Sequence, residues 1–495
     1  MTDNGVLHSG FLRAAALHPD KTALVCGEVA VSFADVERRA NGIAAALDAR
    51  LARRVAICLP NGPHVIDTFF GTVMAGACVM LCDPAWPSAL LKSLIAEHAP
   101  NIVIAENEIL DSVADVIEED VRWSPEQVET LAAKGDTGAA LRSVPCPDSP
   151  FLIGFTSGSS GRPKAFIRSH ATWVESFAMS AQELGTDANS VVVAPGPLSH
   201  GLSLYAVIET LCAGGMAVIQ PHFDAPLVYA AVAVREATTL VVVPAMLDVL
   251  LELAAPETCA SVSGIVTAGA KLSPALRQQA HARFPNADII EYYGASELSF
   301  VTVAKGRENP PPASVGRAFA GVELDVRDET GSSLPPNTTG TVWVRSAMVC
   351  TGYVGETDGS GMRTAGDWAT VGDLGHTDAN GFLYLDGREG SAITSAGYTV
   401  YPSAIEAALL SSPDVADAVV IGLPHARWGE VIAAAVVPVA GRTLHTETLS
   451  AHCHAVLEPY ACPRRWAVVD GFARTQSGKP VRDGIADLFA NDSDV

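Results

Sequence analysis

The strongest chemical signal is a Gly- and Ser-rich segment, Phe155-Thr-Ser-Gly-Ser-Ser-Gly-Arg-Pro-Lys164, which follows an apolar run at residues 151–155. Its two glycines let the backbone turn and approach a ligand closely. Its hydroxyl side chains and consecutive N–H groups can form a nest for an anion, to which Lys164 adds a positive charge. These features suit a triphosphate, although a surface turn has a similar composition. The segment is not a P-loop, because Ala165 follows the lysine.

A second segment, Glu291-Tyr-Tyr-Gly-Ala-Ser-Glu297, lies at the end of an expected strand at Ile289–Tyr293. Ligands favour the carboxyl ends of strands in α/β sheets, and a tyrosine ring there can stack on a purine. Bound phosphates would repel a carboxylate, so Glu297 makes chemical sense mainly as a Mg²⁺ ligand. The alternative is a strand-end turn that exposes a glutamate.

Three weaker motifs follow. An Asp and an Arg that lie close in space can hold the hydroxyls of a ribose, and Gly372-Asp373 with Gly387-Arg388 offers such a pair. A fourth motif is Ser395-Ala-Gly-Tyr398, ahead of Tyr401-Pro402. Arg474-Thr-Gln-Ser-Gly-Lys479 places a lysine in a Ser-Gly loop near the end of the chain, where an ordinary surface charge is the alternative.

The elements that must position these residues alternate between apolar, strand-like runs and helical patterns. Strands are expected in the first three hundred residues at 54–59, 77–82, 101–105, 151–155, 191–194, 240–243, 265–268 and 289–293. This alternation predicts an α/β fold with parallel sheets covered by helices. The pattern weakens between Glu118 and Pro150, and a loop is expected from Gly135 to Pro150. Short β runs follow Pro310, and a compact α+β unit with helices at 402–410 and 446–457 follows Arg388.

Composition limits the partners. The chain has 495 residues and a net charge of −23, which repels nucleic acid and anionic lipid. It also repels ATP, so a nucleotide site must be built locally. The ten cysteines are scattered, as in reduced cytosolic proteins. With no signal peptide and no apolar run long enough for a bilayer, we expect a cytoplasmic protein that does not bind membranes.

The five motifs, in this order between residues 156 and 479, resemble those of the adenylate-forming superfamily, which includes acyl- and aryl-CoA synthetases, peptide-synthetase adenylation domains and luciferases. The resemblance implies a large N-terminal domain of layered sheets and helices with a β-rich subdomain, at residues 1–387. A small mobile α+β domain would follow at residues 388–495. It also implies two half-reactions. ATP and a carboxylic acid form an acyl-adenylate and pyrophosphate, and the acyl group then passes to the thiol of coenzyme A.

The resemblance implies a role for each matching residue. The phosphates of ATP would be held by Thr156, Ser157, Gly158, Ser159, Ser160, Gly161 and Lys164. The remaining nucleotide-binding residues would be Gly269, Ala270, Lys271, Glu291, Tyr292, Tyr293, Gly294 and Ala295, with Asp373 and Arg388 at the ribose. Gly397 and Tyr398 would face the pantetheine arm of CoA. Catalytic roles fall to Lys479, Glu297, Ser296, Lys164 and His200, and Glu297 is the metal ligand.

Two positions depart from the usual pattern of the superfamily. Gly390 stands at the hinge position, where Asp or Lys is common, and the adenylating motif contains Ser296 where Thr is commoner. A glycine still permits the backbone rotation that the two half-reactions require.

The nature of the acid is read from Pro195-Gly-Pro-Leu-Ser-His-Gly201, which contains no carboxylate to pair with an amino group. An α-amino acid would bury an unpaired ammonium there, so the substrate should lack a charged amine. His200 resembles the residue beside the acid in this superfamily, although it can also be a core histidine. The expected apolar walls suit a fatty acid and leave an aryl acid open; they are Ser199, Leu204, Tyr205, Leu298, Ser299 and Phe300.

Three functions remain open. The favoured one is an acyl-CoA synthetase that uses ATP, Mg²⁺ and CoA. The second is a ligase that loads the phosphopantetheine of an acyl carrier protein. The third is a non-catalytic nucleotide-binding protein, against which the presence of both Lys164 and Lys479 argues. The oligomeric state is not predicted.

Overall fold

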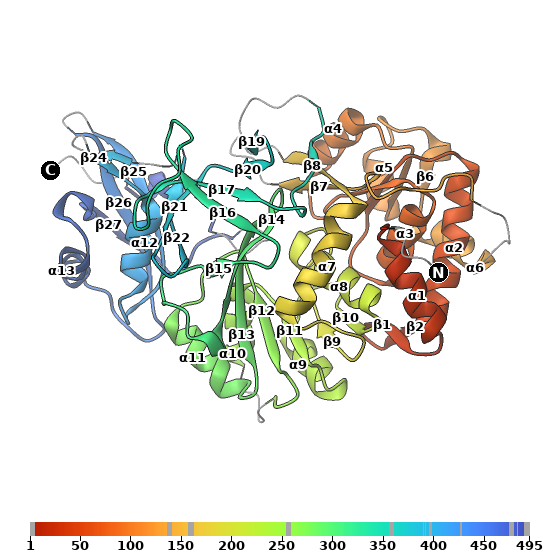
Figure 1. Cartoon of the computed structure of the whole chain (residues 1–495), viewed down its shortest axis with the longest axis horizontal. Coiled ribbons are helices and arrows are strands. Elements are labelled where there is room, and N and C mark those ends of the chain that lie inside the picture. The colour runs from red at the N-terminus through yellow and green to blue at the C-terminus, as the bar shows by residue number, and fades with distance from the viewer. Residues whose placement is uncertain are drawn as a thin grey trace.

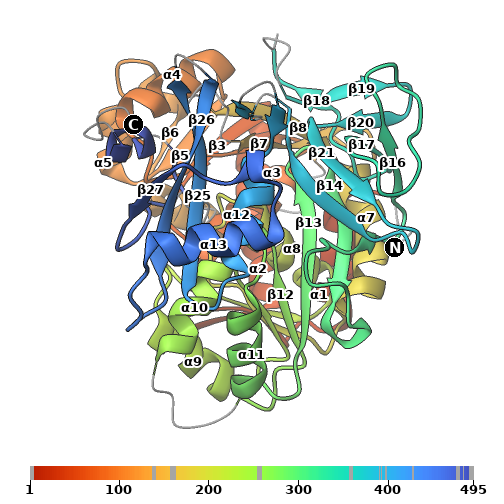
Figure 2. The ribbon, with the colours of Figure 1, turned by 90° about the vertical axis from the view of Figure 1, so that its left-hand side faces the viewer.

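The structure is a computed structural model. It describes residues 5–135, 141–156, 163–253, 259–355, 361–389, 391, 393–395, 398–425, 428–474, 480–482 and 484–489. These residues form four β-sheets, three in a large N-terminal domain and one in a small C-terminal domain (Figures 1 and 2). The fold is therefore the layered α/β architecture with a smaller α+β unit that the sequence predicts.

The first sheet has nine strands, in the order β15-β14-β13-β12-β11-β9-β10-β1-β2. Its strands from β13 to β1 run parallel, and the outer strands at both edges are antiparallel. In chain order they are β1 Thr22–Cys26, β2 Val29–Ser32, β9 Val191–Val193, β10 Met216–Ile219, β11 Thr239–Val241, β12 Gly264–Thr267, β13 Asp288–Ala295, β14 Ser299–Lys305 and β15 Arg317–Ala318.

The second sheet has seven strands, in the order β18-β8-β7-β4-β3-β5-β6. It is parallel from β7 to β6, and β8 and β18 extend it with antiparallel pairs. The strands are β3 Arg54–Cys58, β4 Cys78–Leu81, β5 Ile102–Ala105, β6 Arg122–Trp123, β7 Pro150–Thr156, β8 Lys164–Ser169 and β18 Gly352–Tyr353.

The third and fourth sheets are smaller and follow one another in the chain. The third contains β16 Glu323–Arg327, β17 Gly340–Arg345, β19 Arg363–Ala365, β20 Trp368–Thr370, β21 Asp373–Thr377 and β22 Leu383–Arg388. The fourth contains β23 Ile393–Ser395, β24 Tyr398–Val400, β25 Val415–His425, β26 Gly429–Pro438 and β27 Arg465–Val468. The chain passes from one to the other between Arg388 and Ile393, where the domain boundary is expected.

The main core fills the space between the two large sheets. Helices α1 His8–Leu17, α2 Phe33–Ala49, α3 Pro63–Met74, α7 His170–Leu184 and α8 Gly201–Ala213 contribute to it. Outer faces are covered by α4 Ser88–His98 and α5 Asn107–Ser112 on the seven-stranded sheet, and by α9 Ala225–Val234, α10 Pro244–Glu252 and α11 Pro274–Arg283 on the nine-stranded sheet. Both large sheets are thus buried on two faces, which explains their nearly continuous apolar strands.

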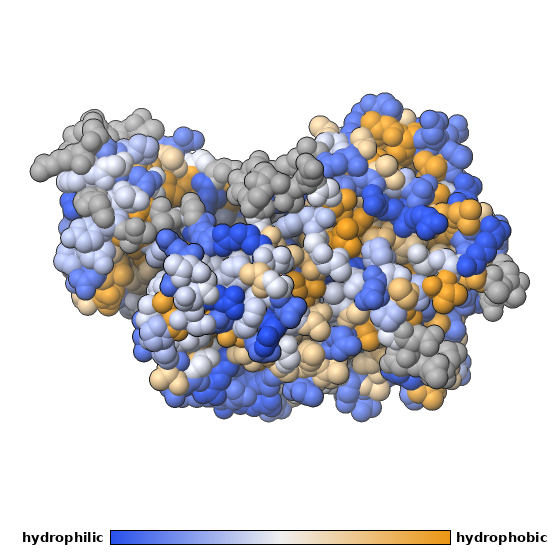
Figure 3. All heavy atoms as spheres, turned by 45° about the horizontal axis from the view of Figure 1, so that its top comes forward, coloured by the Kyte–Doolittle hydropathy of each residue, from blue (hydrophilic) through white to orange (hydrophobic). Residues whose placement is uncertain are grey.

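The C-terminal domain has its own core. Helices α12 Pro402–Leu410 and α13 Thr446–Val456 pack on the fourth sheet, and both match the helices predicted there. On the face drawn in Figure 3, hydrophobic residues are scattered among hydrophilic ones. Within the described residues, no helix combines the length and apolar character needed to cross a membrane.

One helix was not predicted, in the stretch between Glu118 and Gly135 where the pattern weakens. Helix α6, Pro125–Lys134, lies in this stretch and packs on α2. Ser124 accepts a hydrogen bond from Gln127 N, and the Gln127 side chain accepts one from Ser124 N. This capping box satisfies two N–H groups that a helix start leaves free, so the sequence Ser-Pro-Glu-Gln was the signal that could have revealed the helix.

Candidate active site

Strands β7 and β8 pair as an antiparallel hairpin, and the two ends of the Gly- and Ser-rich segment lie in them. Thr156, the last residue of β7, lies opposite Lys164, the first residue of β8. The predicted phosphate-binding residues Ser157, Gly158, Ser159, Ser160 and Gly161 lie outside the described residues. Thr156 and Lys164 therefore mark the two ends of the segment, at the carboxyl end of a parallel strand where ligands commonly bind.

The Glu297 turn lies at the end of β13 and returns into β14. Gly294 has no substitute there, because a Cβ at this position would lie 2.1 Å from the Ser299 carbonyl oxygen. Ser299, which follows in the turn, has a left-handed backbone conformation with a φ of 64°, and this is uncommon for a residue other than glycine. The turn exposes Ser296 and buries Glu297, which is 8% exposed. The predicted hydroxyl of Ser296 is therefore accessible to solvent, whereas the predicted carboxylate of Glu297 is almost fully buried.

Two contacts from β8 and β18 hold this turn. The Tyr353 hydroxyl donates a hydrogen bond to Glu297 Oε1 over 2.7 Å. The buried Arg168 donates to the carbonyl oxygens of Ser296 and Met348, at 2.6 and 2.7 Å. Because Arg168 belongs to the strand that starts at Lys164, the hairpin and the turn form one connected unit.

The charges in this unit affect one another. Burial lowers the pKa of Arg168, and the negative charge of Glu297 partly offsets that effect. Burial and the Glu297 carboxylate both raise the pKa of Tyr353, which therefore stays protonated and continues to donate its hydrogen bond. One carboxylate plus phosphate oxygens is the donor set with which proteins usually hold Mg²⁺. Glu297 fits this role chemically, since it is a carboxylate that Tyr353 and Arg168 connect to the hairpin.

The predicted ribose residues meet at the edge of the third sheet. Asp373 and Arg388 face each other across β21 and β22, and Arg388 Nε lies 2.9 Å from Asp373 Oδ1. The Tyr293 hydroxyl donates a hydrogen bond to the other oxygen, Asp373 Oδ2. The structure thus brings together three predicted nucleotide-binding residues from two sheets.

The loop that follows β12 contains Gly269, Ala270 and Lys271. Gly269 has a φ of 93°, which a side chain would strain. Lys271 Nζ lies 3.6 Å from Glu291 Oε2, and Glu291 Oε1 accepts a hydrogen bond from Leu272 N at 2.9 Å. Glu291 therefore anchors this loop beside β13.

Further contacts close the cluster around Glu291. Arg277 also pairs with Glu291, and Lys271 donates to the Ser314 carbonyl. Burial lowers the pKa of Lys271 to about 8. Tyr292 lies apart from this cluster, because consecutive strand residues point to opposite faces. Its ring lines an internal cavity, while Tyr293 reaches Asp373.

His200 lies at the start of α8, beside a carboxylate that the motif analysis did not single out. His200 Nε2 is 3.6 Å from Asp83 Oδ2, and Ser199 Oγ donates to the same oxygen over 3.4 Å. Asp83 is 3% exposed and also accepts a hydrogen bond from Ala85 N at 2.8 Å. The signal that could have found it is its position two residues after the end of the buried strand β4.

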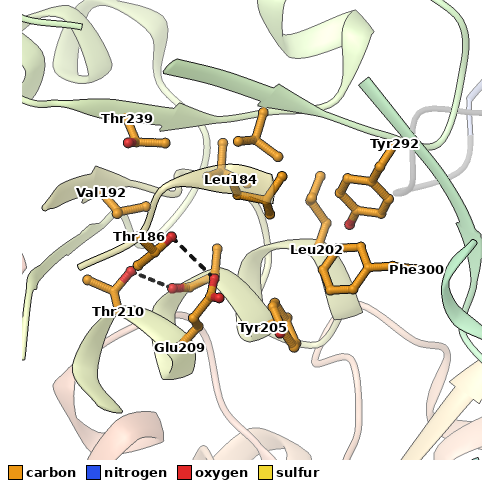
Figure 4. A pocket seen from close by; sticks show the side chains of 13 residues that line it. Leu184, Thr186, Val192, Leu202, Tyr205, Glu209, Thr210, Thr239, Tyr292 and Phe300 are labelled. Carbon is orange, nitrogen blue, oxygen red and sulfur yellow. Dashed lines mark hydrogen bonds between the residues drawn. The ribbon is translucent and has the colours of Figure 1, made fainter. Parts of the chain in front are cut away.

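A narrow cavity lies along α8, the helix that His200 precedes (Figure 4). Leu202, Tyr205 and Glu209 line it from the helix, and Tyr292 and Phe300 line one end from β13 and β14. The cavity is small, about 20 Å³, which is room for about one water molecule. Of the predicted walls, Tyr205 and Phe300 line this cavity, whereas Leu204, Leu298, Ser199 and Ser299 do not.

The C-terminal domain presents the remaining motifs. Lys479 and Gly397 lie outside the described residues, as does the hinge residue Gly390. The two ends of the Lys479 loop are joined by a bridge between Arg474 and Pro480 and by a hydrogen bond from Val481 N to Ala473 O at 2.8 Å. Tyr398 is 53% exposed, and its ring stacks on Tyr460 with 4.4 Å between the ring centres.

Ion pairs tie the base of the Lys479 loop to the fourth sheet and its helix. Arg474 pairs with Asp417, and Arg482 lies 2.7 Å from Glu406. Burial and the charge of Glu252 raise the pKa of Asp248 on α10, and the positive charge of Arg474 partly offsets that rise. The loop base therefore lies within electrostatic reach of the N-terminal domain.

Comparisons with known proteins agree with this geometry. A family model described as AMP-binding enzyme matches residues 11–354, and another described as AMP-binding enzyme C-terminal domain matches residues 404–479. The chain is 31% identical over 479 residues to an uncharacterized acyl–CoA ligase, YhfT, of Bacillus subtilis, covering 95% of this chain and 96% of that protein. It is 29% identical over 503 residues to an indoleacetate–CoA ligase of Aromatoleum aromaticum, covering 97% of each.

A similar solved structure is that of ATP-bound MatB from Rhodopseudomonas palustris. Its TM-score is 0.89 at 25% sequence identity, and the match covers 99% of both chains. The likeness therefore includes both domains.

Proposed function

Since the chain belongs to the AMP-binding enzyme family, we propose that it activates a carboxylic acid with an apolar skeleton and no charged amine. It is an acid–thiol ligase of the acyl-CoA ligase type and uses ATP, Mg²⁺ and CoA. In the first half-reaction a carboxylate oxygen attacks the α-phosphorus of ATP and pyrophosphate leaves. In the second, the CoA thiol attacks the acyl carbon, the thioester forms and AMP leaves.

One structural observation supports the placement of ATP. The hairpin that ends at Thr156 and Lys164 is joined to the Glu297 turn by Arg168 and Tyr353. We assign the phosphates to the hairpin, with Ser157, Gly158, Ser159, Ser160 and Gly161 between its ends. Glu297 would hold Mg²⁺, whose charge lowers the repulsion between the phosphates and the incoming carboxylate. The exposed Ser296 hydroxyl would donate to the α-phosphate.

The remaining nucleotide contacts follow from the position of the phosphates. Asp373 would accept hydrogen bonds from the ribose hydroxyls, with Arg388 beside it. Gly269, Ala270 and Lys271 would line the adenine, held in place by Glu291, and Tyr293, Gly294 and Ala295 would border it from the end of β13. Tyr292 faces the cavity along α8, so we assign its ring to the acid side of the site.

The acid would lie beside His200. His200, oriented by Asp83, would contact the carboxylate, and the predicted apolar walls, Tyr205 and Phe300 among them, would contact the skeleton. Apolar walls suit a fatty chain, and an aryl acid is the second candidate.

The C-terminal domain would serve both half-reactions. We propose residues 1–387 and 388–495 as the two domains, with rotation near Gly390. Lys479 would approach the α-phosphate in the first reaction, and Gly397 and Tyr398 would face the pantetheine of CoA in the second. A carrier-protein phosphopantetheine is the alternative acceptor. We also propose a cytoplasmic location, because all ten cysteines are free thiols.

Lys479→Ala tests the assignment. With ATP and a panel of fatty and aryl acids, this variant should release pyrophosphate roughly 10²–10³-fold more slowly, the cost of removing one preorganised charge from a transition state. It should still transfer the acyl group from a supplied acyl-adenylate to CoA. Arg442→Ala, on the surface of the same domain, is the control and should behave as the wild type. Full pyrophosphate release by Lys479→Ala would refute the role of Lys479. Adenylate without CoA thioester would favour the carrier protein.

A further inference from the structure

The segment that ends at His200 is held in place by a side chain from the other large sheet. Asn61 follows β3 of the seven-stranded sheet. Its amide nitrogen donates to the carbonyl oxygens of Gly196 and Gln220, both at 2.9 Å. Its amide oxygen accepts a hydrogen bond from Leu198 N at 2.8 Å. These partners follow β9 and β10 of the nine-stranded sheet, so one side chain joins the two sheets at the segment that carries His200.

The Asn61 amide is used for these distant contacts rather than for its own turn. An asparagine before a glycine often bonds to its own backbone or caps the next helix. Here the N-cap of α3 is Gly62, and the three partners of Asn61 lie 135, 137 and 159 residues further along the chain. A side-chain amide has two N–H donors, and both are engaged. The contacts of Asn61 are therefore specific to this junction.

The same segment is held at its other end by Asp83. This residue follows β4, which pairs in parallel with β3, so Asn61 and Asp83 come from the same edge of the seven-stranded sheet. Asp83 lies 3.6 Å from His200 Nε2 and acts on the ring. Asn61 binds the backbone two and four residues before the ring. The two side chains thus fix complementary parts of one segment.

The backbone between Leu198 and His200 transmits the position that Asn61 sets. His200 N donates a hydrogen bond to Pro197 O at 3.2 Å, and Leu198 is 1% exposed. Gly196 packs closely on α8, because a Cβ there would lie 2.5 Å from the Ser203 hydroxyl. A displacement at Gly196 or Leu198 therefore reaches the His200 ring. A misplacement of about 1 Å at a reacting group can slow a reaction roughly 100-fold.

We propose that Asn61 is a positioning residue for the acid substrate and that it acts through His200. The inference rests on the proposed function, because that function places the carboxylate of the acid at His200. Asn61 acts through the backbone of residues 195–200 and not by touching the acid. The competing explanation is that Asn61 only stabilises the junction of the two sheets, in which case its loss affects the use of acid and of ATP alike.

A double-mutant cycle separates the two explanations. Pyrophosphate release is measured with ATP and the best acid of the fatty and aryl panel. Asn61→Ala should lower kcat/KM for the acid roughly 10–100-fold and leave the KM for ATP unchanged. In a His200→Ala background the same substitution should have almost no further effect, because the ring whose position it sets is gone. The double variant should therefore behave as His200→Ala does.

Asn101→Ala is the matched control for a structural loss. Asn101 Oδ1 accepts hydrogen bonds from Arg53 N and Arg54 N, at 2.8 and 2.9 Å, at the opposite end of β3. This variant should lower the melting temperature in differential scanning fluorimetry but leave kcat/KM for the acid unchanged. If Asn61→Ala does not fold, Asn61→Asp takes its place in the cycle. It has the same size and an acceptor for Leu198 N, but it turns a carboxylate towards two carbonyl oxygens.

The outcomes are distinguishable. Equal losses for acid and ATP in Asn61→Ala, or an undiminished effect in the His200→Ala background, would overturn the positioning role and leave the ligase function intact. Normal use of the acid by His200→Ala would contradict the placement of the acid at His200, and with it this inference. A wild type that activates no acid at all would instead contradict the proposed function.

Discussion

Asp373 and Arg388 face each other in adjacent antiparallel strands, with 2.9 Å between Arg388 Nε and Asp373 Oδ1. Tyr293 donates a hydrogen bond to the second oxygen of the same carboxylate. Arg388 is the last residue of β22, directly before the chain enters the C-terminal domain. A ribose held by Asp373 would therefore sit beside the expected axis of domain rotation.

Asp373→Asn should weaken nucleotide binding. The amide loses the charge that strengthens hydrogen bonds from the ribose hydroxyls, and such bonds contribute about 1.5–3 kcal/mol. The KM for ATP should therefore rise roughly 10–100-fold, and titration calorimetry should show a similar loss of AMP affinity. Asp367→Asn, on an exposed turn of the same sheet, should change neither value. Unchanged AMP affinity in Asp373→Asn would contradict the ribose assignment.

Glu297→Gln should raise the Mg²⁺ concentration needed for half-maximal pyrophosphate release and slow the reaction roughly 10²–10³-fold, since a charge that acts in the transition state is removed. Tyr353→Phe should have a smaller effect of the same kind, because it removes only the 2.7 Å hydrogen bond that orients Glu297. Glu308→Gln, an exposed glutamate of the same domain, serves as the control. An unaltered Mg²⁺ dependence in Glu297→Gln would exclude the metal role.

Local patterns predicted the strands that carry the site, because buried parallel strands leave continuous apolar runs in the sequence. The run at residues 151–155 became β7, and helix α12 begins and ends where its pattern predicts. The proximity of Asp373 and Arg388 was also expected, from two Gly-containing motifs fifteen residues apart.

The residues that hold the site together could not be predicted from such patterns. Arg168 contacts the carbonyl of Ser296, which is 128 residues away, and Tyr353 reaches Glu297 only because β18 pairs with β8. These contacts depend on the order of strands in the sheet, which local periodicity does not specify. Glu209 was missed for a related reason, since a single glutamate in an apolar helix gives no sign that it faces a cavity.

Asp83→Asn should impair use of the acid more than use of ATP. The substitution removes the charge 3.6 Å from His200 Nε2 but keeps an oxygen that can accept from Ala85 N, so the loop should remain in place. We expect the KM for the acid to rise about 5–30-fold, the equivalent of roughly 1–2 kcal/mol for an interaction with a charged group, and the KM for ATP to stay constant. Asp111→Asn, which is exposed, controls for loss of charge. Equal increases in both KM values would argue against a specific action through His200.

Glu209 should make the stability of the protein depend on pH. Its pKa is about 8 in the folded chain against an ordinary value of 4.5, so between these values the folded state binds more protons than the unfolded state. The contribution of Glu209 to stability is therefore greatest below about pH 4.5 and is lost as the pH rises towards 8, by at most about 1.4 kcal/mol per pH unit. Glu209→Leu has no carboxyl that ionises there. The difference between its melting temperature and that of the wild type should therefore shift in favour of the variant as the pH rises from about 5 to 8.

The comparison of the wild type with Glu209→Leu separates the titration of Glu209 from that of other buried groups. Asp67, whose pKa burial raises to about 7, titrates in both and cancels in the difference. Glu209→Gln removes the same titration and should follow Glu209→Leu, whereas Glu175→Gln, at an exposed position on α7, should follow the wild type. Differential scanning fluorimetry across the pH range measures all four proteins. If the melting temperatures of the wild type and Glu209→Leu depend on pH in the same way, burial does not raise the pKa of Glu209 in the folded chain.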